Sequence, residues 1–278
     1  MKDIKYILWT FSFLFCCSFT LQANEQEVEV SNDTLATQIT PEFSLNQEGV
    51  IDKATADSAY IRGEYATAIQ IYEALLEEGV SPVVYYNLGN SYYKSEEIAK
   101  AILNYERALL LDPGNGDIRA NLEIARAKTV DKEEIVPELF FITWGKSMLN
   151  LLSVDGWAKL GATSFILMLG MVALFLFGRS SLLKKISFGL GLFLLLLVVV
   201  TNSFASIQKK KLIKRDTAIV MTPSVTIRST PSESGTSLFI LHEGKKVTIK
   251  DNTMSEWKEI VLEDGKVGWI ATKEIEII

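Results

Sequence analysis

The spacing of apolar residues changes along the chain and predicts three kinds of structure. From residue 54 to 113, apolar residues recur with the period of a helix, which predicts a helical region. Two stretches, 160–178 and 186–207, contain no Asp, Glu, Lys, Arg or His, and each could cross a hydrocarbon core of about 30 Å. From residue 216 to 278, short alternating runs separated by turn residues predict a small all-β domain.

The first 23 residues have the plan of a secretory signal peptide. Two lysines precede an apolar run, Tyr6 to Leu21, and Ala23 is the small residue expected at a cleavage site. An uncleaved anchor helix is an alternative, and lipidation of Cys16 or Cys17 is a second one, although the residues before Cys16 are not small. In each case we expect the chain from residue 24 onward to be exported.

Acidic side chains dominate the region before the apolar stretches. Residues 24–157 carry 23 acidic and 10 basic side chains, a net charge of −13, which disfavours nucleic acid as a partner. Within this region, residues 24–50 show no sustained apolar period, and we expect a disordered acidic linker there. Both cysteines lie in the leader, so the exported part would hold no thiol nucleophile, disulfide or cysteine metal ligand.

The helical region repeats itself after 33 residues. The two copies are Ala56, Ala59, Gly63, Tyr65, Ala68, Tyr72 and Leu75, then Gly89, Tyr92, Glu96, Ile98, Ala101, Tyr105 and Ala108. The second copy resembles a tetratricopeptide repeat in its large, small and helix-ending residues, which are Tyr85, Leu88, Gly89, Tyr92, Ala101, Tyr105, Ala108 and Pro113. Residues 117–128 resemble the first helix of a further repeat. The resemblance implies two repeats with a capping helix between residues 51 and 130.

The resemblance also implies a concave groove lined by the first helix of each repeat. Asn87 and Asn121 occupy, 34 residues apart, the place of an asparagine that points into this groove, and Asn90 and Tyr93 share a helix face with Asn87. An amide can both donate to and accept from the backbone of an extended peptide. We therefore expect all four to be partner-binding residues. The alternative is that Asn87 and Asn121 only form hydrogen bonds between repeats.

The residues around the apolar stretches predict how these stretches would sit in a membrane. Residues 131–157 form an amphipathic juxtamembrane segment, which would lie at the membrane surface or pack on the repeats. We expect transmembrane helices at 158–178 and 186–207, joined by a cytoplasmic loop at 179–185 with three positive charges. An even number of spans puts the repeats and the C-terminal domain on one side, which the leader makes periplasmic. A basic linker at 208–215, with five positive charges, favours the opposite orientation.

The C-terminal region, residues 216–278, resembles a bacterial SH3-like domain. The segments that carry the resemblance are 225–232, 241–244, 257–260 and 265–270. Gly244 and Gly268 are expected at turns or close backbone approaches. Four residues are expected to fill a small barrel: Val247, Ile249, Ile260 and Ile270. We expect Trp269 to be mainly structural, whereas Trp257 fits a core position and a partner-binding groove equally well.

No arrangement of residues indicates catalysis. His242 is the only histidine, so neither a Ser-His-Asp triad nor a His and Cys metal site can be assembled. The chain has no Gly-rich phosphate loop, and the two apolar stretches lack ionisable residues for an ion path. We expect no enzyme activity, cofactor or metal. A hydrolase that uses a carboxylate pair is an alternative.

The order of leader, tetratricopeptide repeats, two-helix hairpin and SH3-like domain resembles the BatE proteins of the Bat aerotolerance group, over nearly the whole chain. The expected fold is a multidomain membrane protein with an all-α tetratricopeptide array, a two-helix transmembrane hairpin and a small all-β SH3-like barrel. The resemblance implies an inner-membrane scaffold that acts in oxidative stress with von Willebrand factor A-type membrane proteins and a MoxR-type ATPase. We expect a non-catalytic adaptor that binds protein partners. The alternative is a cell-envelope tether that binds peptidoglycan through the SH3-like domain.

Overall fold

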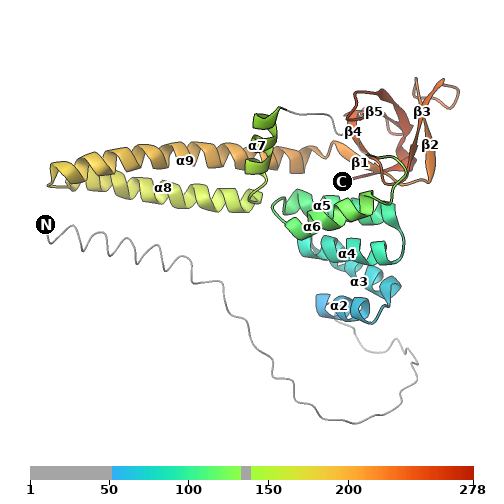
Figure 1. The fold of residues 1–278 in the computed structure, drawn as a ribbon, viewed down its shortest axis with the longest axis horizontal. Helices are drawn as coiled ribbons and strands as arrows, with labels where there is room; N and C mark the ends of the chain where they lie inside the picture. Colours follow the sequence, from blue (N-terminus) through green and yellow to red (C-terminus); the bar gives the residue numbers. More distant parts are fainter. Residues whose placement is uncertain (1–51, 133–138) are drawn as a thin grey trace, which may run out of the picture. The chain divides into compact units, whose positions relative to one another are not determined.

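The computed structural model describes residues 52–132 and 139–278, and these belong to one compact unit. The expected signal peptide, residues 1–23, and the expected acidic linker, residues 24–50, lie outside the described residues. Figure 1 shows a stack of short helices, two long helices side by side, and a C-terminal sheet. The helical array, the two apolar helices and the antiparallel sheet predicted from the apolar spacing are therefore confirmed.

Five helices stack in chain order, and each packs on the next (Figure 1). They are α2 (Lys53–Ile61), α3 (Tyr65–Glu78), α4 (Pro82–Lys94), α5 (Ile98–Leu111) and α6 (Gly116–Arg126). A Cβ at Gly89 would lie 2.7 Å from the ring of Tyr105, so only glycine allows α4 and α5 to approach this closely. The side chain of Asn115 accepts hydrogen bonds from two backbone N–H groups and caps α6.

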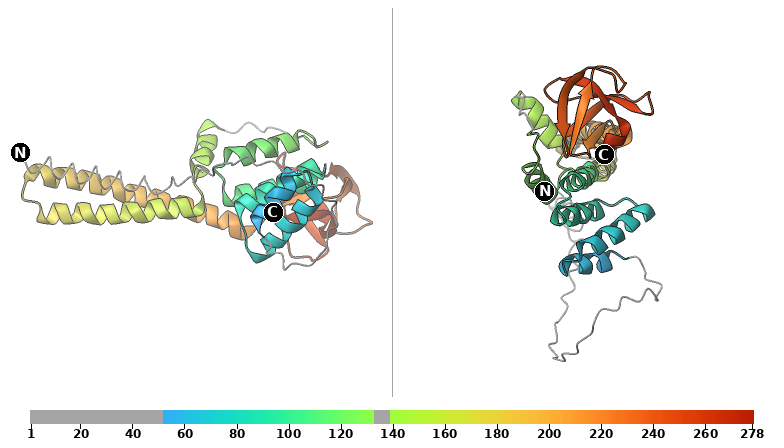
Figure 2. Two further views of the ribbon diagram at one scale, coloured as in Figure 1. Left: turned by 90° about the horizontal axis from the view of Figure 1, so that it is seen from below. Right: turned by 90° about the vertical axis from the view of Figure 1, so that its right-hand side faces the viewer.

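Two long helices follow a short one. The short helix is α7 (Phe140–Leu149), and the long ones are α8 (Val154–Phe177) and α9 (Ser181–Lys214). By length and composition, α8 and α9 could each cross a membrane. They run side by side in Figure 1 and in the left view of Figure 2, and a Cβ at Gly161 would lie 2.9 Å from Oγ1 of Thr201. We call α8 and α9 the apolar hairpin.

Helix α9 is longer than the apolar spacing indicates. It includes most of the expected loop at 179–185 and of the expected basic linker at 208–215. Both segments within α9 are rich in leucine, isoleucine and lysine and contain neither proline nor glycine, so nothing in them interrupts a helix. Lysines in the last turn also suit the negative end of the helix dipole. The helix ends where Arg215 adopts a left-handed conformation, with φ 41°.

The C-terminal region forms a seven-stranded antiparallel sheet in the order β3-β2-β6-β5-β4-β1-β7. Its elements are β1 (Thr217–Val220), β2 (Ser224–Arg228), β3 (Ser237–His242), β4 (Lys246–Asp251), β5 (Trp257–Val261), β6 (Val267–Ala271), the 3-10 helix η1 (Thr272–Glu274) and β7 (Ile275–Ile277). The predicted core residues are buried, which confirms that part of the expectation: Val247, Ile249, Ile260 and Ile270. A Cβ at Gly268 would collide with Ile227, so this glycine allows β6 to approach β2.

Apolar residues of the sheet continue the core of the helical array. Ile219 of β1 and the last residue, Ile278, belong to the same buried cluster as Ile102 of α5. The turn before β4 also meets the array, because a Cβ at Gly244 would lie 2.6 Å from Cγ2 of Thr129. Gly244 has φ +82°, a conformation that glycine adopts without strain. The sheet therefore packs on α5 and on the segment that follows α6.

Ion pairs join the same two regions. Glu106 of α5 is buried and is paired with Arg126 of α6 and with Nζ of Lys246 in β4, the latter at 2.7 Å. Arg107 donates hydrogen bonds to Oε1 of Glu276 at 2.9 Å and to the carbonyl of Ile277 at 2.8 Å. Because these pairs link α5 and α6 to strands more than a hundred residues away in the chain, they hold the sheet against the array.

Candidate functional site

Helices α2, α4 and α6 carry two adjoining hollows. One, of about 220 Å³, is lined by Asp57, Tyr60, Ile61, Tyr72, Asn87 and Asn90. The other, of about 190 Å³, is lined by Tyr60, Asn90, Tyr93, Lys94, Tyr105, Asn121 and Ile124. The two hollows share Tyr60 and Asn90, so they adjoin each other along the stack of helices. We call the two hollows together the groove.

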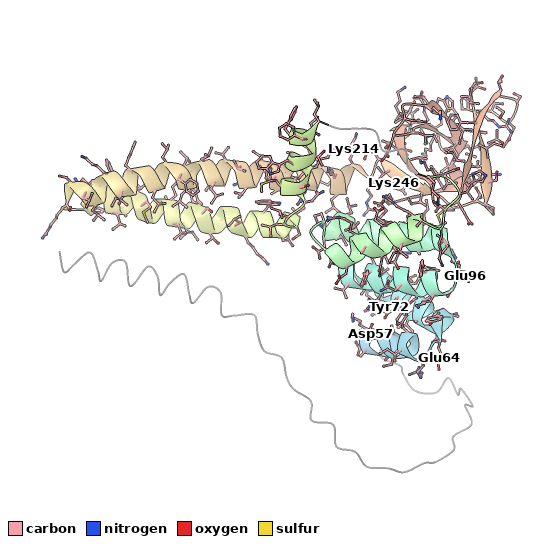
Figure 3. All side chains as sticks on the ribbon, in the orientation of Figure 1. Asp57, Glu64, Tyr72, Glu96, Lys214 and Lys246 are labelled. Atoms are coloured by element: carbon pink, nitrogen blue, oxygen red, sulfur yellow. The ribbon has the colours of Figure 1, made fainter. Side chains whose placement is uncertain are left out.

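Asp57 organises the first half of the groove. Its Oδ1 accepts hydrogen bonds from the hydroxyl of Tyr72 at 2.5 Å and from Nδ2 of Asn87 at 3.1 Å, and its Oδ2 pairs with Lys53 at 2.5 Å. Figure 3 labels Asp57 and Tyr72 on their neighbouring helices. Oδ1 of Asp57 therefore links α2 and α3, the helices of the first repeat, to α4, the first helix of the second repeat.

The protonation of this cluster follows from its contacts. Partial burial raises the pKa of Asp57, but hydrogen bonds from Lys53, Tyr72 and Asn87 and the charge of Lys53 outweigh it and hold this pKa below its ordinary value. Burial, together with the hydrogen bond to Asp57, raises the pKa of Tyr72 well above its ordinary range. At neutral pH Asp57 is thus an ionised acceptor and Tyr72 a neutral donor.

Asn90 has the same role 33 residues later. Its Oδ1 accepts hydrogen bonds from the hydroxyl of Tyr105 at 2.8 Å and from Nδ2 of Asn121 at 2.9 Å. Asn121 Nδ2 also donates to the hydroxyl of Tyr86 at 3.0 Å. One acceptor, one tyrosine and one asparagine thus recur at both junctions, which we call the Asp57 junction and the Asn90 junction.

The structure brings the four predicted groove residues together. Asn87, Asn90 and Asn121 line the groove and also form the hydrogen bonds between repeats that we gave as the alternative role. Tyr93 lines the second hollow, with Nζ of Lys128 lying 4.2 Å from its ring centre. The amide nitrogens of Asn87 and Asn121 make the bonds between repeats, so contact with a peptide stays a prediction.

The other residues that line the groove were not predicted from the sequence, and three of these form hydrogen bonds at the two junctions: Asp57, Tyr72 and Tyr105. The 33-residue period could have identified these three residues, because Asp57 and Asn90 are equivalent positions of the repeat, as are Tyr72 and Tyr105. The difference in residue type between aspartate and asparagine concealed the first of these equivalences.

The sheet carries a separate hollow of about 380 Å³. It is lined by Val130, Asp131, Lys132, Phe239, Ile240, Leu241, Lys245, Leu262, Glu263, Asp264 and Lys266. Trp257, the predicted binding residue of this domain, begins β5 opposite Ala271, is half-buried and lies outside this lining. Trp269 is also half-buried, opposite Glu259. The hollow and Trp257 are therefore distinct features of the sheet.

The single histidine has a structural partner. Nδ1 of His242 lies 2.8 Å from Oδ1 of Asp131, and the backbone N–H of His242 donates to Oδ2 at 2.6 Å. Within the described ranges, 52–132 and 139–278, no group of three or more His, Cys, Asp or Glu side chains could hold a metal ion. These contacts join the segment after α6 to the end of β3.

The family model of the tetratricopeptide repeat matches residues 82–115, which contain α4 and α5. No curated protein matches the chain. The matched repeat contributes Asn87, Asn90, Tyr93 and Tyr105 to the groove. Tetratricopeptide repeats are typically non-catalytic modules for protein interaction, and the groove lies on the helices of this repeat and its neighbours.

Proposed function

We propose that this protein is a membrane-anchored scaffold that binds an extended segment of a partner protein in the groove. The observation that carries the proposal is that two adjoining hollows follow each other along the Asp57 junction and the Asn90 junction. Two hollows in succession suit an elongated ligand better than a small compact one. The tetratricopeptide match, which places one repeat within the groove, supports a protein as the partner.

The side chains of the groove fit a peptide backbone with apolar side chains. The bonds between repeats use the amide nitrogens of Asn87 and Asn121, and we expect their amide oxygens to accept from backbone N–H groups of the partner. The exposed side chain of Ile61 lines the first hollow, the exposed side chain of Ile124 lines the second, and Tyr60 lines both. These three side chains would supply apolar contact with little sequence preference.

The membrane part of the proposal rests on the apolar hairpin. We infer that α8 and α9 cross the bacterial inner membrane, and that both folded regions lie on the periplasmic side. The two open ends of the hairpin support the common side, because Nε2 of Gln208 near the end of α9 donates to the carbonyl of Leu152 before α8, at 2.8 Å. The leader at residues 1–23 supports the periplasmic side.

The identity of the C-terminal domain and of the partners is also part of the proposal. The sheet would be an SH3-like domain that contributes a second contact, for which Trp257 is our candidate residue. By its resemblance to the BatE proteins, the scaffold would act in a Bat-type complex with von Willebrand factor A-type membrane proteins and a MoxR-type ATPase. The antiparallel strand pairing supports the SH3-like identity of the sheet. The order of the domains supports the resemblance to the BatE proteins.

The test separates binding by the amides from their role between repeats. Tagged full-length protein is cross-linked in its native membrane, solubilised and recovered, and the associated proteins are identified by mass spectrometry. The double variant Asn87→Ala and Asn121→Ala removes both amides. The matched control, Tyr72→Phe and Tyr86→Phe, removes one hydroxyl partner from each junction but keeps the amides.

We expect specific partners to be lost at least about tenfold from the amide variant, in line with the loss of two hydrogen bonds to a peptide, and to be retained by the control. Equal recovery with both variants and the original chain would remove the groove from the proposal. Equal loss with both variants would assign Asn87 and Asn121 to the stability of the repeats alone.

A further inference from the structure

Helix α7 presents an apolar face that the described parts of the protein leave uncovered. Phe140 is 84% exposed and Trp144 66% exposed, and Phe141 and Met148 on the same side are exposed as well. Leu149 is the only buried residue of this helix. Four large apolar side chains in a row along one helix form a patch of a kind that usually marks a binding surface.

The opposite side of α7 is mixed. At about 100° per residue, Lys146 lies on the arc away from Phe140 and Trp144, next to Ile142, which is 42% exposed, and the buried Leu149. The helix therefore has one continuous, exposed apolar arc, and its one charged side chain lies on the other side. Of the two positions expected for residues 131–157, packing on the repeats does not account for this exposed arc.

Hydrogen bonds fix the end of α7 to the apolar hairpin. The carbonyl of Leu149 accepts from Nε2 of Gln208 at 2.6 Å and from Nε1 of Trp157 at 3.0 Å. The ring of Trp157 also packs edge-on against Phe204, with ring centres 5.0 Å apart. These contacts tie the last turn of α7 to the first turn of α8 and to α9.

The hydrogen bonds between α7 and the apolar hairpin lie at the ends of the two apolar stretches. Gln208 immediately follows the apolar stretch of α9 and precedes three exposed lysines, residues 209–211. Trp157 lies just before the apolar stretch of α8. Tryptophan and lysine at the ends of apolar helices mark the level of the lipid headgroups.

We propose that α7 lies in the headgroup layer of the bilayer, with Phe140, Phe141, Trp144 and Met148 turned toward the acyl chains. This inference rests on the proposed membrane insertion of α8 and α9. The partner is a lipid surface, and the lysines at 209–211 favour anionic headgroups beside the helix. An amphipathic helix of this kind buries its apolar face about 5–10 Å into the headgroup and acyl boundary.

The consequence concerns the repeats. A Cβ at Gly114, in the loop between α5 and α6, would lie 2.7 Å from the carbonyl oxygen of Leu151, so the segment after α7 touches the array. The depth of α7 then sets the height of the groove above the membrane. A groove held close to the lipid surface suits a partner segment that is itself near the membrane.

The test measures depth at single positions in the full chain. Cys16 and Cys17 are changed to serine, and one cysteine is introduced by Phe140→Cys, Lys146→Cys or Leu169→Cys. Each variant carries an environment-sensitive fluorophore and is reconstituted into vesicles of phosphatidylcholine and phosphatidylglycerol. Quenching is compared between iodide in the aqueous phase and lipids that carry a quencher near the headgroup or deep in the acyl chain.

The expected pattern is distinct for each position. The label at 140 should be quenched by the shallow lipid quencher and about threefold less by iodide than the label at 146, because the apolar arc is buried in the lipid and the side that carries Lys146 is not. The label at 169, in the middle of α8, should respond to the deep quencher.

Two results would contradict the proposed position of α7 even if α8 and α9 cross the membrane. With position 169 deep, a label at 140 as accessible to iodide as the label at 146 would place α7 in water. A label at 140 shielded from both iodide and lipid quenchers would show that protein, such as a second copy, covers α7. If position 169 itself is accessible to iodide, the proposed membrane insertion fails first, and the inference fails with it.

Discussion

The two repeats share a plan but differ in what surrounds their second helices. Glu73 of α3 and Glu106 of α5 are counterparts 33 residues apart. Glu73 is exposed and accepts a hydrogen bond from the hydroxyl of Tyr92, whereas the side chain of Glu106 is only 8% exposed and is paired with Arg126 and Lys246. The sheet makes this difference, because Lys246 belongs to β4. The repeated sequence sets the helix packing, but the neighbouring domain sets what an equivalent residue contributes.

The largest expected effect is at this pair of glutamates. Glu106→Ala removes a buried carboxylate that joins α5, α6 and β4, and we expect it to lower the free energy of unfolding by about 2–3 kcal/mol. Glu73→Ala, the matched control, should cost less than about 1 kcal/mol because its site is exposed. Denaturant unfolding of the detergent-solubilised full chain, followed by circular dichroism, measures both. Similar losses in the two variants would contradict the contribution of the sheet.

A smaller effect is expected at the turn inside each repeat. Glu96 adopts a left-handed conformation with φ 64°, and its counterpart Gly63 has φ +81°. A side chain costs about 1 kcal/mol in this conformation. Glu96→Gly makes the second turn like the first, and we expect it to stabilise the protein by roughly 0.5 kcal/mol once the greater freedom of glycine in the unfolded chain is included.

The reverse exchange is the control for this turn. A Cβ at Gly63 would meet no atom within 4 Å, so Gly63→Ala tests the backbone conformation without a steric clash. We expect it to destabilise the protein by about 1 kcal/mol in the same unfolding experiment. A loss of stability in Glu96→Gly would show that contacts of the Glu96 side chain outweigh the backbone strain.

The difference between the repeats also separates what the sequence could predict from what it could not. Helical periodicity, the absence of charge in the apolar stretches and strand alternation depend on local spacing, so the three kinds of structure were predictable. The groove asparagines followed from the repeat. The packing of Ile219 and Ile278 against Ile102 joins segments more than a hundred residues apart, and no local pattern indicates which surfaces meet. The burial of Glu106 was unpredictable for the same reason.

The junctions of the repeats carry the smallest expected effect, and its sign depends on pH. Because the pKa of Asp57 is lowered in the folded protein, its ionised form stabilises the fold above the unfolded pKa of about 4, and this contribution is lost as pH falls through the lower folded value. Asp57→Asn makes the Asp57 junction resemble the Asn90 junction. The side chain of Asp57 is 34% exposed, and after allowance for solvent screening we expect the variant to be less stable by under about 1 kcal/mol at pH 7.

The reverse exchange, Asn90→Asp, distinguishes the effect of the charge of Asp57 from the general effect of low pH on the stability of the protein. Lys53, which pairs with Asp57 from four residues before it, has Tyr86 as its counterpart, so a carboxylate introduced by Asn90→Asp would meet hydrogen-bond donors but would lack the equivalent of Lys53. The lysine that lines its hollow is Lys94, four residues after Asn90. Unfolding free energies measured from pH 7 down to about pH 3.5 should converge for Asp57→Asn and the original chain. We expect Asn90→Asp to have a lower free energy of unfolding than the original chain at pH 7. This difference should also shrink in acid, because protonation removes the charge of the new carboxylate. A deficit of Asp57→Asn that stays constant over this range would show that the geometry of the junction matters and the charge of Asp57 does not.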